Sequence, residues 1–275
     1  WRSDGTLFGT TEVIDLVMGS GSSFPTEFAL GDDGLVYFSA NDGVHGTELW
    51  ATGGTAGGTQ VLDLLLGITS SSPTNITAVQ NTLLFAAGAA GAEPWLLTSM
   101  GGGQIRDVRS GVPSSSPRDF TYLPWLGQVL FSADDTGFNR ELWIVDHTPD
   151  AIKITEIEPA GGSAPSRLRL VNGNIVFQAH TVANGLELWR TDGTELGTQI
   201  ITDTYTGAHD GLLADQGVTR GTTFYVFPAN FADAGIEPAV TDGTTITRLG
   251  DILPGIGTSW IHDEATSTTA ASTPT

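Results

Sequence analysis

Carboxylates that recur at regular intervals are the residues of this chain whose type and spacing could do chemistry. A glutamate is repeated at one fixed point of a sequence pattern, at Glu48, Glu93, Glu141, Glu187 and Glu237. A ring of five such carboxylates around a channel could bind cations. The same side chains could also accept hydrogen bonds from backbone N–H groups of a neighbouring repeat. Because the group recurs in every repeat, the pattern favours this second, structural role.

Two loops carry extra acids and raise calcium as an alternative. Hard cations take several oxygen ligands, with backbone carbonyls added. The predicted ligands come from two equivalent loops and the glutamates that follow them: Asn41, Asp42, Glu48, Asp134, Asp135 and Glu141. The equivalent loops at Gly88, His180 and Asn230 lack the acids, and no D-x-D-x-D-G loop is present. Calcium therefore remains an alternative to a purely structural role for these residues.

Other chemistry is weakly represented. The chain has no Cys, so neither disulfides nor thiolate metal sites form, and its five His residues are scattered. No G-x-S-x-G, H-E-x-x-H or phosphate-loop pattern occurs. Four residues outside the repeated pattern are the candidate ligand contacts. Trp125 and Trp260 are aromatic candidates, and Arg167 and Arg169 could point into a central channel.

The elements that position these residues are repeats of 45 to 50 residues, marked by a tryptophan in nearly every copy: Trp1, Trp50, Trp95, Trp143 and Trp189. In the last copy Ala239 takes this place. A large aromatic at one fixed point of each repeat most simply fills the space between adjacent sheets, although it could also stack on sugars. Each repeat holds four short segments of strand character and no helical periodicity.

Four short antiparallel strands per repeat predict an all-β fold, a β-propeller of four-stranded blades. Six third–fourth strand hairpins but five first–second hairpins can be counted, so six blades are favoured and five are the alternative. Residues 259–264 would supply a first strand and join the N-terminal hairpin, so that both termini share a blade and close the ring. Residues 1–264 are expected to form one domain, and residues 265–275 a flexible Ser/Thr/Ala/Pro tail or linker. The pattern also indicates that residues preceding Trp1 belong to the first copy.

The segment from Glu187 to Thr198 reads Glu-Leu-Trp-Arg-Thr-Asp-Gly-Thr-Glu-Leu-Gly-Thr. It resembles the ELWxxDGTxxGT repeat found in large secreted or surface proteins of bacteria, and the resemblance extends over nearly the whole chain. The family implies a propeller-like fold and an extracellular or cell-surface setting, and it implies no particular enzyme activity. Departures from the repeat lie at Thr98–Gly103 and at Ala239.

Charge narrows the range of partners. The formal net charge is −20, with 11 Lys and Arg against 31 Asp and Glu, so phosphate backbones and anionic membrane surfaces are repelled. No apolar run approaches the roughly 18 residues of a membrane span. Because each repeat carries structural turns and no catalytic constellation stands apart from the repeat, we expect a non-catalytic binding or assembly module. The setting that the resemblance implies would place its protein or polysaccharide partner at the cell surface. The alternative is a glycan-active enzyme, or another hydrolase or lyase, with its site in the central channel.

Overall fold

The computed structural model describes residues 1–98, 101–111, 113–145, 151–213, 217–252 and 254. Its strands form five four-stranded antiparallel sheets in chain order, which confirms the predicted all-β class. The only helix among these residues is the short 3₁₀ turn η1 (Ala56–Gly58). None of the described segments is a helix long and apolar enough to cross a membrane.

Each sheet is a meander in which consecutive strands pair. Sheet 1 holds β1 (Thr26–Leu30), β2 (Val36–Asn41), β3 (Thr47–Thr52) and β4 (Thr59–Leu62). Sheet 2 holds β5 (Thr74–Val79), β6 (Thr82–Ala87), β7 (Glu93–Thr98) and β8 (Gly101–Gln104). Sheet 3 holds β9 (Arg118–Leu123), β10 (Gln128–Asp134), β11 (Arg140–Val145) and β12 (Ala151–Lys153). Sheet 4 holds β13 (Ser166–Val171), β14 (Asn174–Thr181), β15 (Gly185–Thr191) and β16 (Gln199–Ile200). Sheet 5 holds β17 (Val218–Arg220), β18 (Phe224–Phe231), β19 (Gly235–Thr241) and β20 (Ile246–Arg248).

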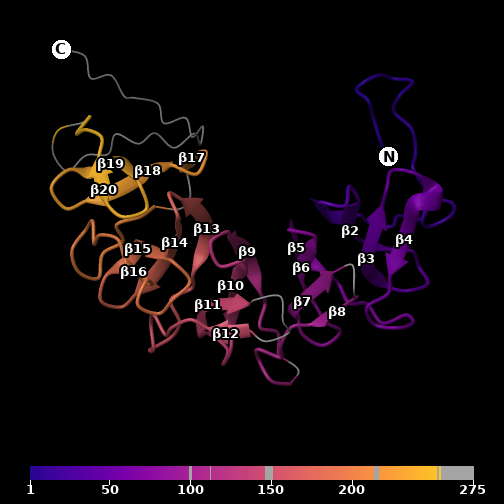
Figure 1. Ribbon diagram of the computed structural model, residues 1–275, viewed down its shortest axis with the longest axis horizontal. Coiled ribbons are helices and arrows are strands. Elements are labelled where there is room, and N and C mark those ends of the chain that lie inside the picture. Colours follow the sequence, from indigo (N-terminus) through magenta and orange to yellow (C-terminus); the bar gives the residue numbers. More distant parts are fainter. Residues whose placement is uncertain (99–100, 112, 146–150, 214–216, 253, 255–275) are drawn as a thin grey trace, which may run out of the picture.

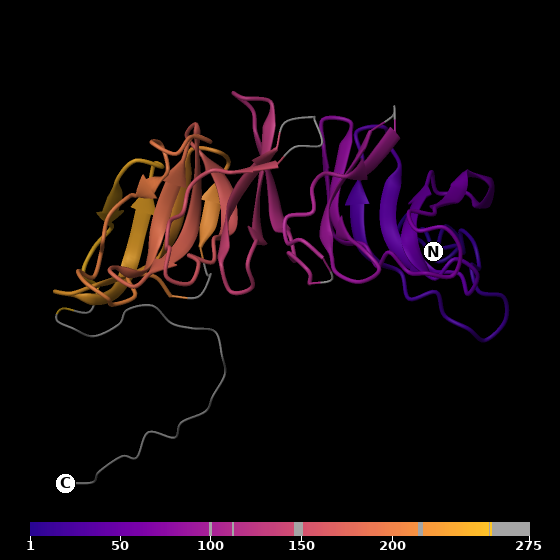
Figure 2. The ribbon, with the colours of Figure 1, turned by 90° about the horizontal axis from the view of Figure 1, so that it is seen from below.

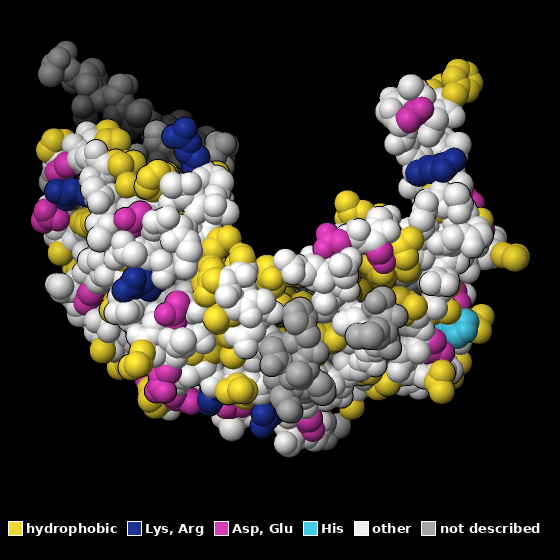
Figure 3. Space-filling model, viewed as in Figure 1, with side chains coloured by type: hydrophobic (Ala, Val, Ile, Leu, Met, Phe, Trp, Pro, Cys, Tyr) yellow, Lys and Arg dark blue, Asp and Glu magenta, His cyan; other side chains and the backbone are white. Residues whose placement is uncertain are grey.

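The sheets follow one another along an arc (Figure 1), and in the perpendicular view they stand side by side (Figure 2). The space-filling view shows a wide hollow on the concave side of the arc (Figure 3). The first strands β1, β5, β9 and β13 contact one another in sequence and lie on the concave side. We call this side, with β17, the inner edge. Sheets 1 and 5 lie at opposite ends of the arc. The expected ring closure rests on residues 259–264, which lie outside the described residues.

The core is divided into layers between consecutive sheets. Alternate residues of a strand face opposite sides of its sheet, so each sheet supplies apolar side chains to both neighbours. The second strands β6, β10, β14 and β18 each place a fully buried or nearly fully buried phenylalanine in such a layer: Phe85, Phe131, Phe177 and Phe227. Trp95 packs between sheets 1 and 2, Trp143 between sheets 2 and 3, and Trp189 between sheets 3 and 4. Trp50 packs with Phe38 on the face of sheet 1 that points away from sheet 2.

The N-terminal segment forms a sixth hairpin of the third–fourth type, reduced to one bridge between Arg2 and Thr11. Here the expectation that Trp1 fills an inter-sheet space is wrong, because Trp1 is 81% exposed. The reason is local: the hairpin is not part of any of the five sheets, so Trp1 has no second-strand phenylalanine of its own sheet to pack against.

Candidate functional site

The Asp-Gly-Thr turn of the repeat is locked by its own side chains. Asp192 Oδ1 accepts hydrogen bonds from the Thr194 backbone N at 2.9 Å and hydroxyl at 2.7 Å. Gly197 N then donates to Thr194 Oγ1, and Thr198 Oγ1 donates to the Thr194 carbonyl. Hydrogen bonding to the ionised form lowers the pKa of Asp192 below its usual value. The repeated Asp and Thr residues therefore act as turn locks.

Two other turns reproduce this geometry. In the N-terminal hairpin, Asp4 Oδ1 accepts from both the N and the hydroxyl of Thr6, and Ser3 and Thr10 hydroxyls meet at 2.6 Å. In sheet 5, Asp242 accepts from Thr244 and Thr245, and these bonds lower its pKa to about 2. The N-terminal hairpin is thus built like the third–fourth strand hairpins of complete sheets.

The repeated glutamates join one sheet to the linker that leads into the next. Glu48 is fully buried; its Oε1 accepts from Ser71 N at 2.7 Å, and its Oε2 accepts from the Ser71 hydroxyl at 2.6 Å and from Leu64 N at 3.1 Å. Glu93 binds Ser115 in the same way, with distances of 2.9 and 2.8 Å. Glu141 binds Ser163 at 3.0 and 2.6 Å. These carboxylates serve as joints between sheets.

The joint between sheets 4 and 5 differs chemically. Gly211 stands where the other linkers have serine, because its carbonyl accepts from Asn230 N as the Ser71 carbonyl accepts from Gly88 N. Glu187 therefore lacks the serine donors, and the Thr204 hydroxyl donates to it instead, 3.2 Å from Oε2. Burial, together with nearby Asp203, raises the pKa of Glu187 to about 7, despite hydrogen bonds from Thr204 and Tyr205.

The inner edge carries a second set of contacts that the sequence did not reveal. A residue two positions after each linker proline takes a left-handed backbone conformation inside a β-bulge: Glu27, Asn75, Asp119 and Arg167, with φ between 54° and 60°. Asn75 N donates to Glu27 Oε2 at 2.7 Å, and Arg167 N donates to Asp119 Oδ1 at 3.3 Å. The available signal was the polar residue at this spacing, since Asn and Asp tolerate the left-handed region.

The two predicted arginine contacts lie on the inner strand of sheet 4, as expected. Arg167 is the bulge residue of β13 and is exposed. Arg169 lies with its guanidinium carbon 4.9 Å from the centroid of the Tyr225 ring in sheet 5. The structure thus brings Arg167 to the hollow and uses Arg169 to join two sheets.

The predicted aromatic contact Trp125 lies in the turn between β9 and β10. It is 40% exposed, and its Nε1 donates to the Asp192 carbonyl of sheet 4 at 3.0 Å. That hydrogen bond fixes the orientation of an aromatic ring whose other parts contact solvent. The second predicted aromatic, Trp260, lies outside the described residues.

The residues predicted to bind calcium form separate contacts with other residues of the chain. Asp42 binds His45 at 2.6 Å, and Asp134 binds Arg140 at 2.7 Å. Asp135 binds Lys153, also at 2.7 Å. Asn41 accepts from Gly43 N, while Glu48 and Glu141 are the buried joints. Within the described part of the chain, no group of three or more His, Cys, Asp and Glu side chains is placed to hold a metal ion.

No known family profile matches the sequence, and no curated protein matches it. Solved structures do. A catalytically inactive virginiamycin B lyase from Staphylococcus aureus with quinupristin aligns over 86% of this chain and 73% of its own, at 17% identity and a TM-score of 0.50. A Mycobacterium tuberculosis puromycin-hydrolyzing peptidase aligns over 82% of this chain and 36% of its own, at 15% identity and a TM-score of 0.50.

TolB from Acinetobacter baumannii aligns over 81% of this chain at 14% identity, with a TM-score of 0.46. This chain spans about half of that TolB, 53% of its length. At identities this low the similarities show the fold alone. Together with the five sheets in an arc, they show a β-propeller-like all-β fold.

Proposed function

We propose that this chain is a non-catalytic binding and assembly module of the extracellular space or cell surface, built from ELWxxDGTxxGT-type repeats. The observation that supports it is how the repeated acids are used. The glutamates in the first three joints accept hydrogen bonds from the following linker, and the Asp-Gly-Thr aspartates lock turns. Recognition is then left to residues that differ from one repeat to another.

The surface we propose for recognition is the Trp125 turn. An exposed aromatic ring held in one orientation can stack on a sugar or pack on a protein side chain at little entropic cost. Replacement of Trp125 by Ala should remove binding to whichever bacterial polysaccharides an array identifies for the parent chain. Replacement by Phe should keep part of the binding, since the stacking face remains. An array without any bound glycan would exclude the polysaccharide form of the proposal.

The finer architecture we propose is a ring of six units. Three features support it: the hollow between the ends of the arc (Figure 3), the sixth hairpin with its intact turn lock, and the contact made by Ser23. The Ser23 carbonyl accepts from Asn41 N as the Ser71 carbonyl accepts from Gly88 N, so sheet 1 begins with the serine half of a joint. X-ray scattering of the chain in solution should fit a closed ring better than an open arc. A profile that fits only the open arc would contradict it.

One observation favours the enzymatic alternative. Among the described residues, sheet 3 carries two arginine–carboxylate pairs, with Arg118 3.8 Å from Asp119 at the inner edge and Arg140 2.7 Å from Asp134 nearby. A hydrolase or lyase site would use such a cluster to bind an anionic substrate. Incubation with uronate-rich polysaccharides separates the two functions. New reducing ends or unsaturated products that disappear in Arg118→Ala would establish catalysis and refute the non-catalytic proposal.

A further inference from the structure

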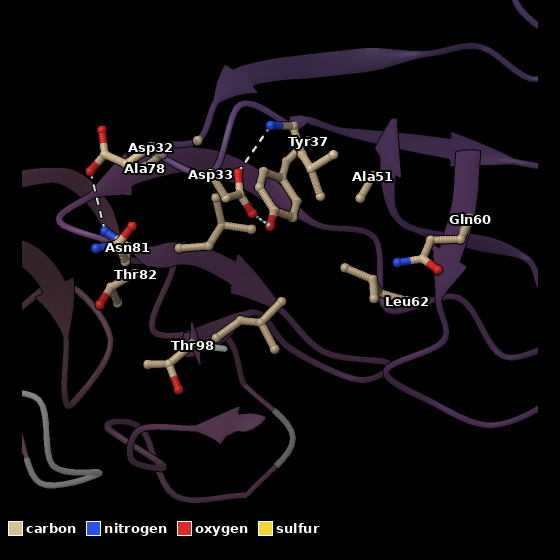
Figure 4. Close-up of a pocket in the computed structure, with 14 residues that line it drawn as sticks. Asp32, Asp33, Tyr37, Ala51, Gln60, Leu62, Ala78, Asn81, Thr82 and Thr98 are labelled. Carbon is tan, nitrogen blue, oxygen red and sulfur yellow. Dashed lines mark hydrogen bonds between the residues drawn. The ribbon is translucent and has the colours of Figure 1, made fainter. Parts of the chain in front are cut away.

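Sheets 1 and 2 enclose a cavity of about 370 Å³, which lies beside the turns that follow β1 and β5 (Figure 4). Its walls include Ala51 of β3, Leu62 of β4 and Ala78 of β5. Its volume falls in the range of small-molecule sites, about 300 to 1,000 Å³. It is separate from the inner-edge contacts and from the Trp125 turn.

The cavity has a sequence cause. Ala51 pairs with Tyr37 in sheet 1, at the register point where sheet 2 pairs Leu96 with Leu84. Ala78 pairs with Leu83, at the point where sheet 3 pairs Tyr122 with Val129. In the next layer, Leu96 and Tyr122 pack against one core cluster and fill the equivalent space. Two small side chains therefore face a layer that larger ones fill elsewhere.

The chemistry of the lining is uneven. Leu62, Leu83 and Leu97 form an apolar wall, while Asp32 and Asp33 supply negative charge, and none of the described residues that line the cavity is Lys or Arg. Asp33 Oδ2 accepts from the Tyr37 hydroxyl at 2.7 Å, and Asp33 Oδ1 accepts from Leu35 N at 3.0 Å.

Asp33 carries its negative charge at neutral pH. Hydrogen bonds from Leu35 and Tyr37 lower the pKa of Asp33, which stays ionised. Burial and the neighbouring Asp33 raise the pKa of Tyr37 to about 12, so the phenol keeps the proton it donates. Asp32 Oδ2 accepts from Asn81 N across the gap at 3.2 Å.

We propose that this cavity binds a small organic ammonium whose apolar body lies between Ala51 and Ala78 and whose cationic group lies at Asp32 and Asp33. Charge complementarity selects the class, because two carboxylates without a neighbouring base disfavour anions. The apolar wall disfavours small inorganic cations, which carry no apolar body to bury.

The test uses 2-phenylethylammonium as probe, with 2-phenylethanol and 3-phenylpropionate as its neutral and anionic counterparts, measured by calorimetry and by NMR shifts of the protein. We expect the ammonium to bind at least about tenfold more tightly than the alcohol, and the carboxylate not to bind. Ala78→Leu fills the cavity with the side chain that sheet 4 carries at this register position, Leu170, and it should abolish binding of all three.

Charge is tested separately from shape. Asp32→Asn keeps an oxygen that can accept from Asn81 N, and it should reduce the ammonium preference about tenfold while leaving the alcohol unchanged. Glu195→Gln, an exposed acid in the sheet 4 turn, removes the same charge elsewhere and should change nothing. Unchanged ammonium binding in Ala78→Leu or in Asp32→Asn, equal binding of the anion, or no binding of any probe would overturn the proposal. If Ala78→Leu unfolds, Asp32→Asn decides.

Discussion

Glu187 makes the joint between sheets 4 and 5 sensitive to pH, and replacing it tests the reasoning on all joints. Its folded pKa is about 7 against an ordinary value of 4.5. A group with a raised folded pKa contributes full stability below its ordinary pKa and loses that contribution as pH rises through the folded value. The stability of the chain should therefore fall between about pH 4.5 and about pH 7 through this one carboxyl.

The magnitude follows from the shift. A difference of about 2.5 pKa units corresponds to about 3 kcal/mol at roughly 1.4 kcal/mol per unit, and residual access of water to the site reduces this to about 2 kcal/mol. Glu187→Gln cannot ionise. Relative to the parent chain, it should therefore gain about 2 kcal/mol in unfolding free energy when the pH is raised from about 5 to about 8.

Urea unfolding followed by tryptophan fluorescence at the two pH values measures this gain. The matched control is Glu48→Gln, because Glu48 accepts three hydrogen bonds, two from Ser71 and one from Leu64. An amide there turns an acceptor into a donor facing donors, and we expect a loss of about 2 to 3 kcal/mol at the higher pH. The reasoning fails if the two variants change stability with the same sign at that pH, or if the difference between Glu187→Gln and the parent chain does not vary with pH.

Three further predictions concern the turn locks and the joints. Gly193→Ala should cost about 2 to 3 kcal/mol in thermal or urea unfolding, because φ is +96° and the new Cβ would lie 2.7 Å from a Leu126 methyl; Gly54→Ala, with φ +80° and open space, should cost only about 1 kcal/mol, and equal costs would contradict the packing argument. Ser115→Ala removes the hydroxyl that donates to Glu93 Oε2 and should cost about 2 kcal/mol, whereas an unchanged midpoint would show that the joint is not stabilising. Asp242→Ala should lower the unfolding free energy at neutral pH. This loss should disappear as the pH falls from about 3.8 towards about 2, because the parent aspartate is protonated over that range; a loss that persists in acid would mean that the lock does not depend on charge.

Much of the fold could be predicted because turn chemistry and strand alternation are local. The Asp-Gly pairs, the apolar second strands and the linker prolines each act within a few residues, so sheet composition and strand order followed from the sequence. The prediction that Trp1 is packed between sheets was wrong, because burial there depends on a sheet that the hairpin does not join. The repetition favoured a structural role for each glutamate over cation binding, but it could not show which donors lie opposite each carboxylate.

The candidate sites were harder to predict because they depend on the contents of the neighbouring sheet. Trp125 was expected to be an exposed contact, and nothing local shows that its Nε1 reaches Asp192, 67 residues further along the chain. The left-handed bulges also arise between strands. Glu27 and Arg167 occupy them although neither residue type favours that conformation, so the sheet imposes it. The cavity needs small residues from two sheets, Ala51 and Ala78, to line the same space, which no single repeat reveals.

The Glu48–Ser71 joint explains why the cavity between sheets 1 and 2 stays open. A void between two packed layers normally costs stability, and the layers shift to reduce it. Here Glu48 holds Ser71 by two hydrogen bonds, and Glu27 holds the inner edge through Asn75 N, so collapse would break contacts at both places. The spacing of the sheets is thus held by polar contacts away from the cavity as well as by the Asp32–Asn81 contact at its rim, and not by the apolar side chains that line it. Such an arrangement lets the lining residues change without loss of the fold, which is the condition under which one layer of a repeating structure can acquire a binding site.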